Sequence, residues 1–380
     1  MNLRVRPADE LVDASCARVG EDDFGGAWFR SGLDQLVESV NADVVLTPMG
    51  VQVIEDWIAK LLANRLRIEG WYRQHPEVAD TIIGGPTLVV GLPRTGTTAL
   101  VGMLAEDERF RALRQWEAST PCPPPDLETE ATDPRVDEAR QLAASLPPEL
   151  AEMHLLDPLG PEEDFDVVGL GFRSGHFGGF WPLYQYPNWW LECDMTSTFE
   201  YHARVLRLLG SRRPPNHWLL KNPCHLFQLD VFAREYPDAR FVMTHRDPRR
   251  AIPSLCSLEM LSFGAVTETV DPHRHGAFQL QFWAEGMRRA LAAREQIGEH
   301  RFLDVFHTDL VRDPMGEIRR IYAFIERDLE PAASTAIERY VQRTATGPGR
   351  HEYTADQFGL RTVEIEERFA EYTERFEAAT

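Results

Sequence analysis

Positive charge is scarce in this sequence of 380 residues, which carries 40 Lys and Arg against 60 Asp and Glu, for a net charge of −20 at pH 7. Nucleic-acid-binding proteins neutralise phosphates with clustered Lys and Arg, so this balance argues against a general nucleic-acid-binding surface. The five cysteines are scattered, odd in number and without CxxC spacing, which favours neither a disulfide framework nor a zinc knuckle. Any basic site must therefore be local. The cysteine pattern fits a protein of a reducing compartment best.

Long hydrophobic runs are missing as well. The N-terminal stretch MNLRVRPADELVDAS contains no apolar core of a signal peptide, and no stretch approaches the length of a membrane-spanning helix. Hydrophobic residues nevertheless make up 43% of the chain and aromatic residues 10%, which is enough for a substantial core. We therefore expect a folded, soluble, cytoplasmic protein.

The chain contains a loop of the phosphate-binding type. A short apolar run, Leu88 to Val90, ends at Gly91 and leads through a mixed loop into apolar residues at helical spacing, which predicts strand, loop and helix. The loop matches the pattern G-x-x-x-x-G-K-[ST] at Gly91, Gly96 and Thr98, but Thr97 occupies the lysine position. Such a loop favours a phosphate or sulfate and lacks the lysine that a triphosphate needs. An ordinary glycine turn is the alternative.

Short strands alternate with helices through the rest of the chain, with strands expected at 217–220, 240–244 and 301–306. This alternation predicts an α/β fold with a P-loop-like central parallel sheet flanked by helices, and ligand binding at the rim where the strands end. The chain before the first strand has helical periodicity. We expect an N-terminal helical subdomain over residues 1–86 and an α/β domain over residues 87–380.

A stretch rich in glycine, proline and aromatic residues interrupts this alternation at about residues 155–199. Its most aromatic part, GFRSGHFGGFWPLYQYPNWWLECDM, is too irregular for one element. Two interpretations have equal weight: a hydrophobic cluster packed over the core, or an apolar wall of a substrate site.

Arg246 and Ser254 form a second constellation, eight positions apart after the strand expected at 240–244. Arginine pairs bidentately with phosphate, and a serine hydroxyl in the next helix can donate to the same group. The alternative is a surface arginine paired with Asp247 and a serine on a helix face. Pro253 lies inside this helix, so we expect it to disturb the backbone bonding just before Ser254.

Together, the PRTGTT loop and the Arg–Ser pair resemble the two phosphate-binding elements of sulfotransferases that use PAPS (3′-phosphoadenosine 5′-phosphosulfate). The stretches WLLKNPCHLFQLDVFAREYPDARFVMTHRDP and GRHEYTADQFGL are similar to the bacterial branch of that family. The resemblance runs roughly from Thr87 to the C-terminus. It implies an enzyme that transfers a sulfuryl group from PAPS to a hydroxyl, or an amine, of a small-molecule or lipid-like acceptor, leaves 3′,5′-ADP and needs no metal.

The resemblance also implies which residues bind the donor. Arg246 and Ser254 would hold the 3′-phosphate, and Arg350 and His351 would close over the nucleotide. Arg94 stands where many cytosolic members carry lysine. This difference keeps the positive charge but replaces a compact ammonium group with a planar guanidinium group. The residues expected to hold the 5′-phosphosulfate are Pro93, Arg94, Thr95, Gly96, Thr97 and Thr98.

Sulfuryl transfer needs cations at the bridging oxygen and a base for the acceptor proton. Arg94 and Lys221 are the expected cations, Lys221 because it follows the end of a predicted strand. Glu117 is the expected base, since it lies 23 positions after Arg94 and the protein-tyrosine branch of the family uses a glutamate at a similar spacing. His154 and Glu163 are the alternatives.

Two rival functions remain at this level. A P-loop kinase or NTPase would bind ATP with magnesium, against which Thr97 argues. A regulatory nucleotide-binding protein would keep the two anion sites and lose the base. His273 and His275 lack the further ligands that a zinc site requires, so no metal is expected. The acceptor and the oligomeric state are not predicted.

Overall fold

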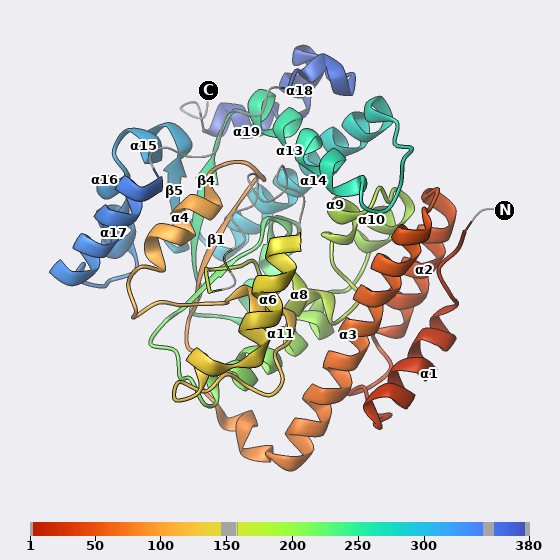
Figure 1. Cartoon of the computed structure of the whole chain (residues 1–380). Helices are drawn as coiled ribbons and strands as arrows, with labels where there is room; N and C mark the ends of the chain where they lie inside the picture. The colour runs from red at the N-terminus through yellow and green to blue at the C-terminus, as the bar shows by residue number, and fades with distance from the viewer. Residues whose placement is uncertain (1–2, 146–156, 158, 345–352, 377–380) are drawn as a thin grey trace.

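The computed structural model describes residues 3–145, 157, 159–344 and 353–376. A five-stranded parallel sheet lies at the centre of these residues, in the order β2-β3-β1-β4-β5 (Figure 1). The predicted α/β class with a central parallel sheet is confirmed. The strands are β1 (Thr87–Gly91), β2 (Arg111–Ala112), β3 (Trp218–Lys221), β4 (Arg240–His245) and β5 (Phe302–Phe306).

Strand β1 is the middle strand, and its position decides where a ligand can bind. Val89 pairs with Lys221 of β3 on one side and with Val242 of β4 on the other. The order of the strands reverses at β1, and ligands of open α/β sheets bind beyond the carboxyl ends of the strands at such a reversal. The loop after Gly91 therefore begins at the expected place.

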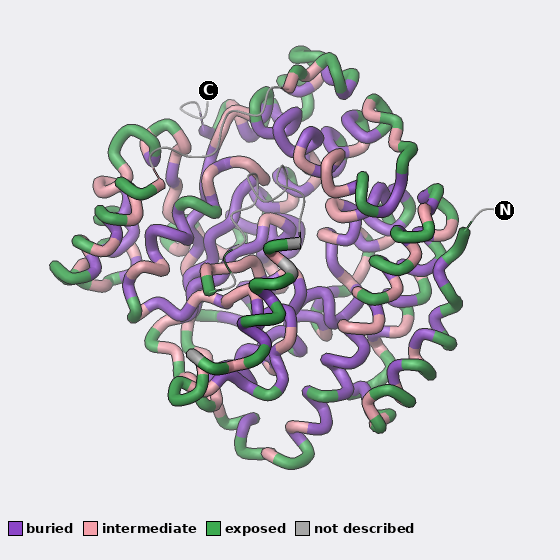
Figure 2. The backbone as a smooth tube through the Cα atoms, in the orientation of Figure 1, coloured by how far each residue is buried: buried purple, intermediate pink, exposed green. Residues whose placement is uncertain are grey.

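Alternate residues of the strands face two different layers. Val89, Leu219 and Val242 pack on one side with the helices that Figure 1 shows together beside β5. Those helices are α4 (Thr97–Leu104), α15 (His307–Arg312), α16 (Pro314–Phe324) and α17 (Pro331–Thr344). Leu88 and Leu220 face the other layer, whose helices include α11 (Thr196–Gly210), α12 (Leu229–Glu235), α13 (Pro248–Phe263) and α14 (Pro272–Ile297). Strands β1, β3 and β4 are consequently buried at nearly every residue, as the buried segments in the middle of Figure 2 indicate, whereas β2 and β5 are partly exposed.

The segment before β1 is helical, as predicted. It consists of α1 (Ala8–Val19), α2 (Arg30–Asp43) and the long α3 (Pro48–Gln74), which lie together at one side of the molecule in Figure 1. The fully buried Arg65 of α3 donates to the carbonyl oxygens of Leu170 (3.0 Å) and Phe24 (2.5 Å). Apolar residues of α3 share one core with the sheet. The division into domains at residue 86 stays a prediction.

The aromatic stretch contains the short helices α8 (Phe165–Gly169), α9 (Phe177–Phe180) and α10 (Gln185–Trp190). Trp181 and Trp190 are 1% exposed, and the Trp181 ring lies edge-on to Trp57 of α3, 5.2 Å between centroids. Phe165 and Phe180 instead line a cavity. Trp181 and Trp190 therefore belong to a hydrophobic cluster in the core, while a substrate wall at Phe165 and Phe180 stays a prediction.

Helix α13 runs without interruption past Pro253, so the proline, which cannot donate a backbone hydrogen bond, does not break the helix before Ser254. Asp247 stabilises the N-terminus of the helix as its N-cap, because its side chain accepts from the Arg249 N–H at 2.8 Å. Ile252 is fully buried, and this packing outweighs one missing backbone bond.

The remaining α-helices are α5 (Gln115–Ser119), α6 (Pro134–Ser145), α18 (Thr362–Arg368) and α19 (Ala370–Arg375). Within the described ranges, no helix is both long enough and apolar enough to span a bilayer.

Candidate functional site

The loop between β1 and α4 has the backbone of an anion cradle. Gly96 precedes α4 with φ of 95°, and Arg94 adopts φ of 67°, a conformation that is rare for residues with a side chain. A Cβ atom at Gly91 would lie 2.3 Å from Thr244 Oγ1 of β4, so only glycine fits there. Backbone N–H groups of such a turn, followed by a helix N-terminus, bind phosphate or sulfate.

The threonines of this loop have different surroundings. Thr95 is fully buried, and its hydroxyl donates to the Leu92 carbonyl oxygen at 2.6 Å and lies 2.6 Å from the Thr244 hydroxyl. Its side chain thus holds the loop against β4, while its backbone remains part of the cradle. Thr97 and Thr98 line the adjacent cavity.

The two motifs noted in the sequence meet in space. Arg94 Nε donates to Ser254 Oγ at 3.2 Å, and Arg246 Nη1 donates to the Arg94 carbonyl oxygen at 2.7 Å. Burial lowers the pKa of Arg94, and the charge of Arg246 lowers it further. Two neighbouring guanidinium groups beside a cradle of N–H groups form a site for an anion with more than one charged group.

Lys221 ends β3 and reaches the loop from the neighbouring strand. It is one of two lysines in the sequence, and its side chain is 4% exposed. Its Nζ donates to Thr98 Oγ1 at 3.1 Å and lies 3.1 Å from Glu163 Oε1. An ammonium group is thereby held between the anion loop and a carboxylate.

Glu163 also contacts His176, whose Nε2 lies 3.0 Å from Glu163 Oε2. Burial acts to raise the pKa of Glu163, but Lys221 and His176 outweigh it and lower the pKa to about 2. The pKa of His176 is raised, because Cys224 and Glu163 outweigh the effect of burial. Glu163 is therefore an ionised carboxylate that faces the cavity.

Glu162 lines the same cavity but has the opposite titration behaviour. Burial raises its pKa to about 7, although Lys221 acts in the other direction. Its Oε1 accepts the Glu163 backbone N–H at 2.8 Å. Sequence reasoning missed Glu162, although the PEED run contains both carboxyl groups.

Glu117, the base expected from the sequence, lies elsewhere. Arg111 donates to both of its carboxylate oxygens, at 2.5 and 2.6 Å, and the Arg114 N–H donates to it at 2.8 Å. Glu117 is fully buried and is not among the residues that line the cavity beside the loop. Burial acts to raise its pKa, and Arg111 outweighs this and lowers it. The structure thus gives Glu117 a structural partner and does not place it with Arg94. His154, Arg350 and His351 lie outside the described residues.

A buried polar network supports Glu163 and Lys221 from behind. The Asp164 N–H donates to the Lys221 carbonyl oxygen at 3.1 Å. The Asp164 carboxylate accepts from Asn222 Nδ2 at 2.7 Å and lies 2.8 Å from His225 Nε2 and 3.2 Å from His202 Nε2. Asp164 follows Glu163 in the sequence and Asn222 follows Lys221, so these contacts connect the two site residues through their sequence neighbours. The sequence showed no signal for this network beyond the polar residue types themselves.

The cavity beside the loop, called the central cavity below, is walled by four parts of the chain. Besides the loop at Pro93, Arg94, Thr97 and Thr98, these are Glu162, Glu163 and Phe165, part of the aromatic stretch, and the facing sides of α13 and α14; Pro223 and Cys224, just after β3, complete the wall. Away from the loop, aromatic and aliphatic side chains and glycines form most of the wall, which also contains the polar residues Glu259, Ser262 and Gln279 of α13 and α14. An apolar molecule with a reactive polar end suits such a cavity.

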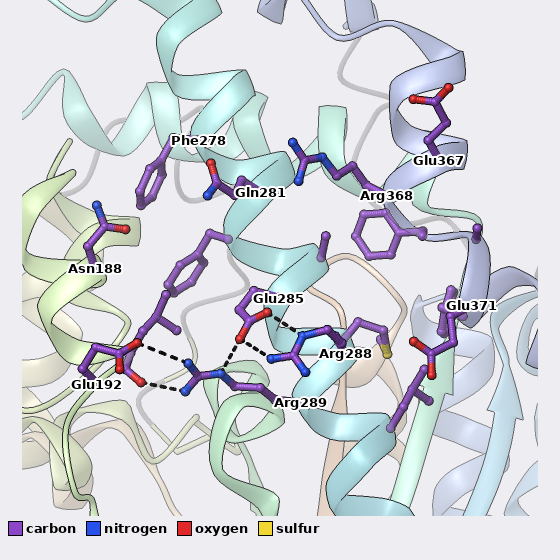
Figure 3. A pocket seen from close by; sticks show the side chains of 18 residues that line it. Asn188, Glu192, Phe278, Gln281, Glu285, Arg288, Arg289, Glu367, Arg368 and Glu371 are labelled. Carbon is purple, nitrogen blue, oxygen red and sulfur yellow. Dashed lines mark hydrogen bonds and ion pairs between the residues drawn. The ribbon is translucent and has the colours of Figure 1, made fainter.

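A larger cavity of about 580 Å³ lies between α10, α14 and the region of α18 and α19. Figure 3 shows its charged wall, where Glu285 pairs with both Arg288 and Arg289, and Glu192 also reaches Arg289. It contains no residue of the 91–98 loop. Its lining has four glutamates and three arginines, so it offers no excess of positive charge for an anion, and the anion loop opens on the central cavity instead.

Comparison with known proteins identifies the family and the fold. Residues 86–331 match the model of the Sulfotransferase family. Sulfotransferase STF9 from Mycobacterium avium is 33% identical with a TM-score of 0.89, covering 98% of this chain and 97% of that one. Sulfotransferase STF1 from Mycobacterium tuberculosis H37Rv is 30% identical with a TM-score of 0.87, covering 97% and 99%.

A curated relative gives a further similarity. The omega-hydroxy-beta-dihydromenaquinone-9 sulfotransferase Stf3 of Mycobacterium bovis is 26% identical over 263 residues, which span 64% of this chain and 64% of that relative. The family match covers more than half of the chain, and the chain therefore belongs to the sulfotransferase family, as its resemblance to the bacterial branch predicted.

Proposed function

We propose that this chain transfers a sulfuryl group from PAPS to a hydroxyl group of an apolar, lipid-like acceptor. The convergence of Arg94, Arg246 and Ser254 on the 91–98 loop carries the proposal. A donor with one 5′-phosphosulfate and one 3′-phosphate matches two adjacent anion sites and needs no triphosphate lysine. The Walker-type alternative would require a lysine where Thr97 stands.

In this proposal, different residues of the central cavity carry out different parts of the reaction. The acceptor oxygen bonds to sulfur while the bond from sulfur to the bridging oxygen breaks, and the electron pair remains on the departing 3′,5′-ADP. Lys221 and Arg94 stabilise the charge that builds on that oxygen. When Lys221 turns to the donor, Glu163 loses its ion pair and becomes more basic, so it accepts the proton of the hydroxyl.

Glu163 takes the role of base in the proposal in place of Glu117, because it lies with Lys221 at the cavity. The apolar wall of that cavity supports a lipid-like acceptor. The similarity to a relative named for an omega-hydroxylated menaquinone supports the same class. A cytoplasmic location stays a prediction.

Calorimetry with 3′,5′-ADP, 5′-AMP and ATP tests the donor site. We expect a marked preference for 3′,5′-ADP, and we expect Arg246→Ala to remove it. Equal affinities for 3′,5′-ADP and 5′-AMP would contradict PAPS as the donor. Incubation with labelled PAPS and a lipid extract, followed by mass analysis of the labelled product, tests the acceptor class.

A further inference from the structure

Glu163 contacts two different basic side chains, one at each of its carboxylate oxygens. Lys221 Nζ lies 3.1 Å from Oε1, and His176 Nε2 lies 3.0 Å from Oε2. The side chains of Glu163 and His176 are 16% and 13% exposed, and both residues line the central cavity. The carboxylate therefore has a partner at each oxygen and still faces the space in which an acceptor would lie.

The two partners of this carboxylate differ in their own contacts. Lys221 also donates to Thr98 Oγ1 at 3.1 Å, so it already touches the anion loop. Among the hydrogen bonds and ion pairs of the described residues, none joins His176 to that loop. An anionic donor therefore competes for Lys221 and leaves the contact between His176 and Glu163 in place.

His176 is held by the same short segment that carries Glu163. Its ring stacks on Phe165, with 5.4 Å between centroids and 28° between the rings, and its centroid lies 6.0 Å from that of Phe180. Phe165 is two residues after Glu163, so this segment both packs on the imidazole and pairs with its Nε2. The raised pKa of His176 keeps the ring charged near neutral pH.

We propose that His176 is a positioning residue, which holds Glu163 by Oε2 so that Oε1 takes the proton of the acceptor hydroxyl. The inference rests on the proposed function and adds an order of events to it. Donor binding first draws Lys221 away from Oε1. The acceptor proton then passes to Oε1 while the acceptor oxygen bonds to sulfur, and water later removes the proton from the carboxyl group.

The charge of His176 matters once Lys221 has turned to the donor. Burial acts to raise the pKa of Glu163, and the two basic side chains oppose it. A buried carboxylate without a nearby cation gains a proton from water and no longer acts as a base. The imidazolium of His176 therefore keeps Glu163 ionised until the acceptor hydroxyl arrives.

Two variants separate the N–H of His176 from its ring. His176→Phe keeps a ring for stacking and loses the N–H and the charge, whereas the amide of His176→Gln can still donate to Oε2. With labelled PAPS and 1-decanol at pH 8, we expect kcat to fall about 10²-fold in His176→Phe, because the reacting carboxylate is misplaced. His176→Gln should regain about tenfold of this loss, and both variants should bind 3′,5′-ADP as the wild type does.

Proton uptake tests the proposal without turnover. Titration calorimetry of 3′,5′-ADP at pH 6, in buffers of different ionisation enthalpy, gives the number of protons taken up on binding. Both variants lack the charge that keeps Glu163 ionised when Lys221 turns to the nucleotide, so we expect each to take up more protons than the wild type. The other charged residues of the cavity wall, which both variants retain, are Arg94, Glu162 and Glu259.

His75→Phe is the matched control. His75 also stacks on an aromatic ring, that of Trp71, and its Nδ1 lies 3.3 Å from Glu77 Oε1. It does not line the central cavity. This variant should have the kcat and the proton uptake of the wild type.

An unchanged kcat in His176→Phe would overturn the proposal, and so would equal losses of kcat in His176→Phe and His176→Gln. Proton uptake equal to that of the wild type in His176→Gln would also overturn it, which decides the matter even if His176→Phe does not fold. Failure of the proposed function has a different signature, because 3′,5′-ADP would then bind no more tightly than 5′-AMP in the wild type and in both variants.

Discussion

Lys221 Nζ lies 3.1 Å from Glu163 Oε1 and 3.1 Å from Thr98 Oγ1, so one ammonium group joins a carboxylate to the anion loop. Glu163 and Thr98 both line the central cavity. Binding of an anionic donor competes with Glu163 for this cation, which links donor binding to the basicity of the carboxylate.

Replacing this lysine tests its role directly. Lys221→Met keeps most of the side-chain stem and removes the charge, so we expect kcat to fall about 10²–10³-fold, as for other groups that stabilise a developing negative charge. Lys60→Met is the control, because Lys60 lies 3.6 Å from Asp166 and does not line the central cavity. An unchanged kcat for Lys221→Met in steady-state assays would remove Lys221 from the mechanism.

Glu163 and Glu117 can be separated by measuring turnover and stability together. Glu163→Gln should lower kcat about 10²–10⁴-fold while 3′,5′-ADP still binds, because a base is lost. Glu117→Gln leaves Arg111 buried without its ionised partner and should lower the free energy of unfolding by about 3–5 kcal/mol. The folded fraction of that variant should turn over normally. If Glu117→Gln folds normally and loses turnover, the base is Glu117.

The pH dependence of kcat/KM, which reports the ionisation of the free enzyme, distinguishes Glu163 from Glu162. The pKa of Glu163 is lowered to about 2, so this carboxylate stays ionised as the pH falls well below neutral. The pKa of Glu162 is raised to about 7, so that group gains a proton near neutrality. With Glu163 as the base, we expect no decline of kcat/KM from pH 8 to pH 6. A decline centred near pH 7 that disappears in Glu162→Gln would assign the base to Glu162.

Ser254→Ala tests the 3′-phosphate site. The hydroxyl of Ser254 accepts from Arg94 Nε at 3.2 Å and would also donate to the phosphate, so we expect the affinity for 3′,5′-ADP to fall about tenfold. The affinity for 5′-AMP should stay the same. Ser257→Ala, another buried serine of α13, is the control. Equal losses for both nucleotides in a titration would place Ser254 outside the 3′-phosphate site.

Asp164 is expected to matter for both activity and acid stability. Burial acts to raise its pKa, but His225 and His202 outweigh this and hold it far below the usual range. Its contribution to stability is present above the pKa of the unfolded chain and is lost as the pH falls, so unfolding of the wild type should become easier in acid. Asp164→Asn should weaken this dependence.

The same variant should also lower kcat, since Asp164 ties Asn222 and the Lys221 carbonyl to the Glu163 segment. Asp166→Asn is the matched control, as Asp166 is buried, contacts Trp57 and Lys60, and does not line the central cavity. The positioning role fails if both variants have the same kcat and the same acid denaturation curve, recorded by circular dichroism.

Local patterns were enough to predict much of the fold. The predicted strands at 217–220, 240–244 and 301–306 agree with β3, β4 and β5 to within one residue at each end. A buried parallel strand is a short apolar run between turn signals, and its limits depend on adjacent residues. Pro253 was judged by the same local rule, and there the packing of α13 prevailed.

By itself, the sequence determined the anion loop, the Arg246 and Ser254 pair and the rim on which they lie, because these follow from residue types at short fixed spacings. Only the tertiary structure decided which carboxylate faces the cavity. Glu117 pairs with Arg111 in the interior, while Glu163 meets Lys221, 58 positions away in the chain. Burial and the choice of a charged partner depend on residues that folding brings together, and no local pattern contains that information.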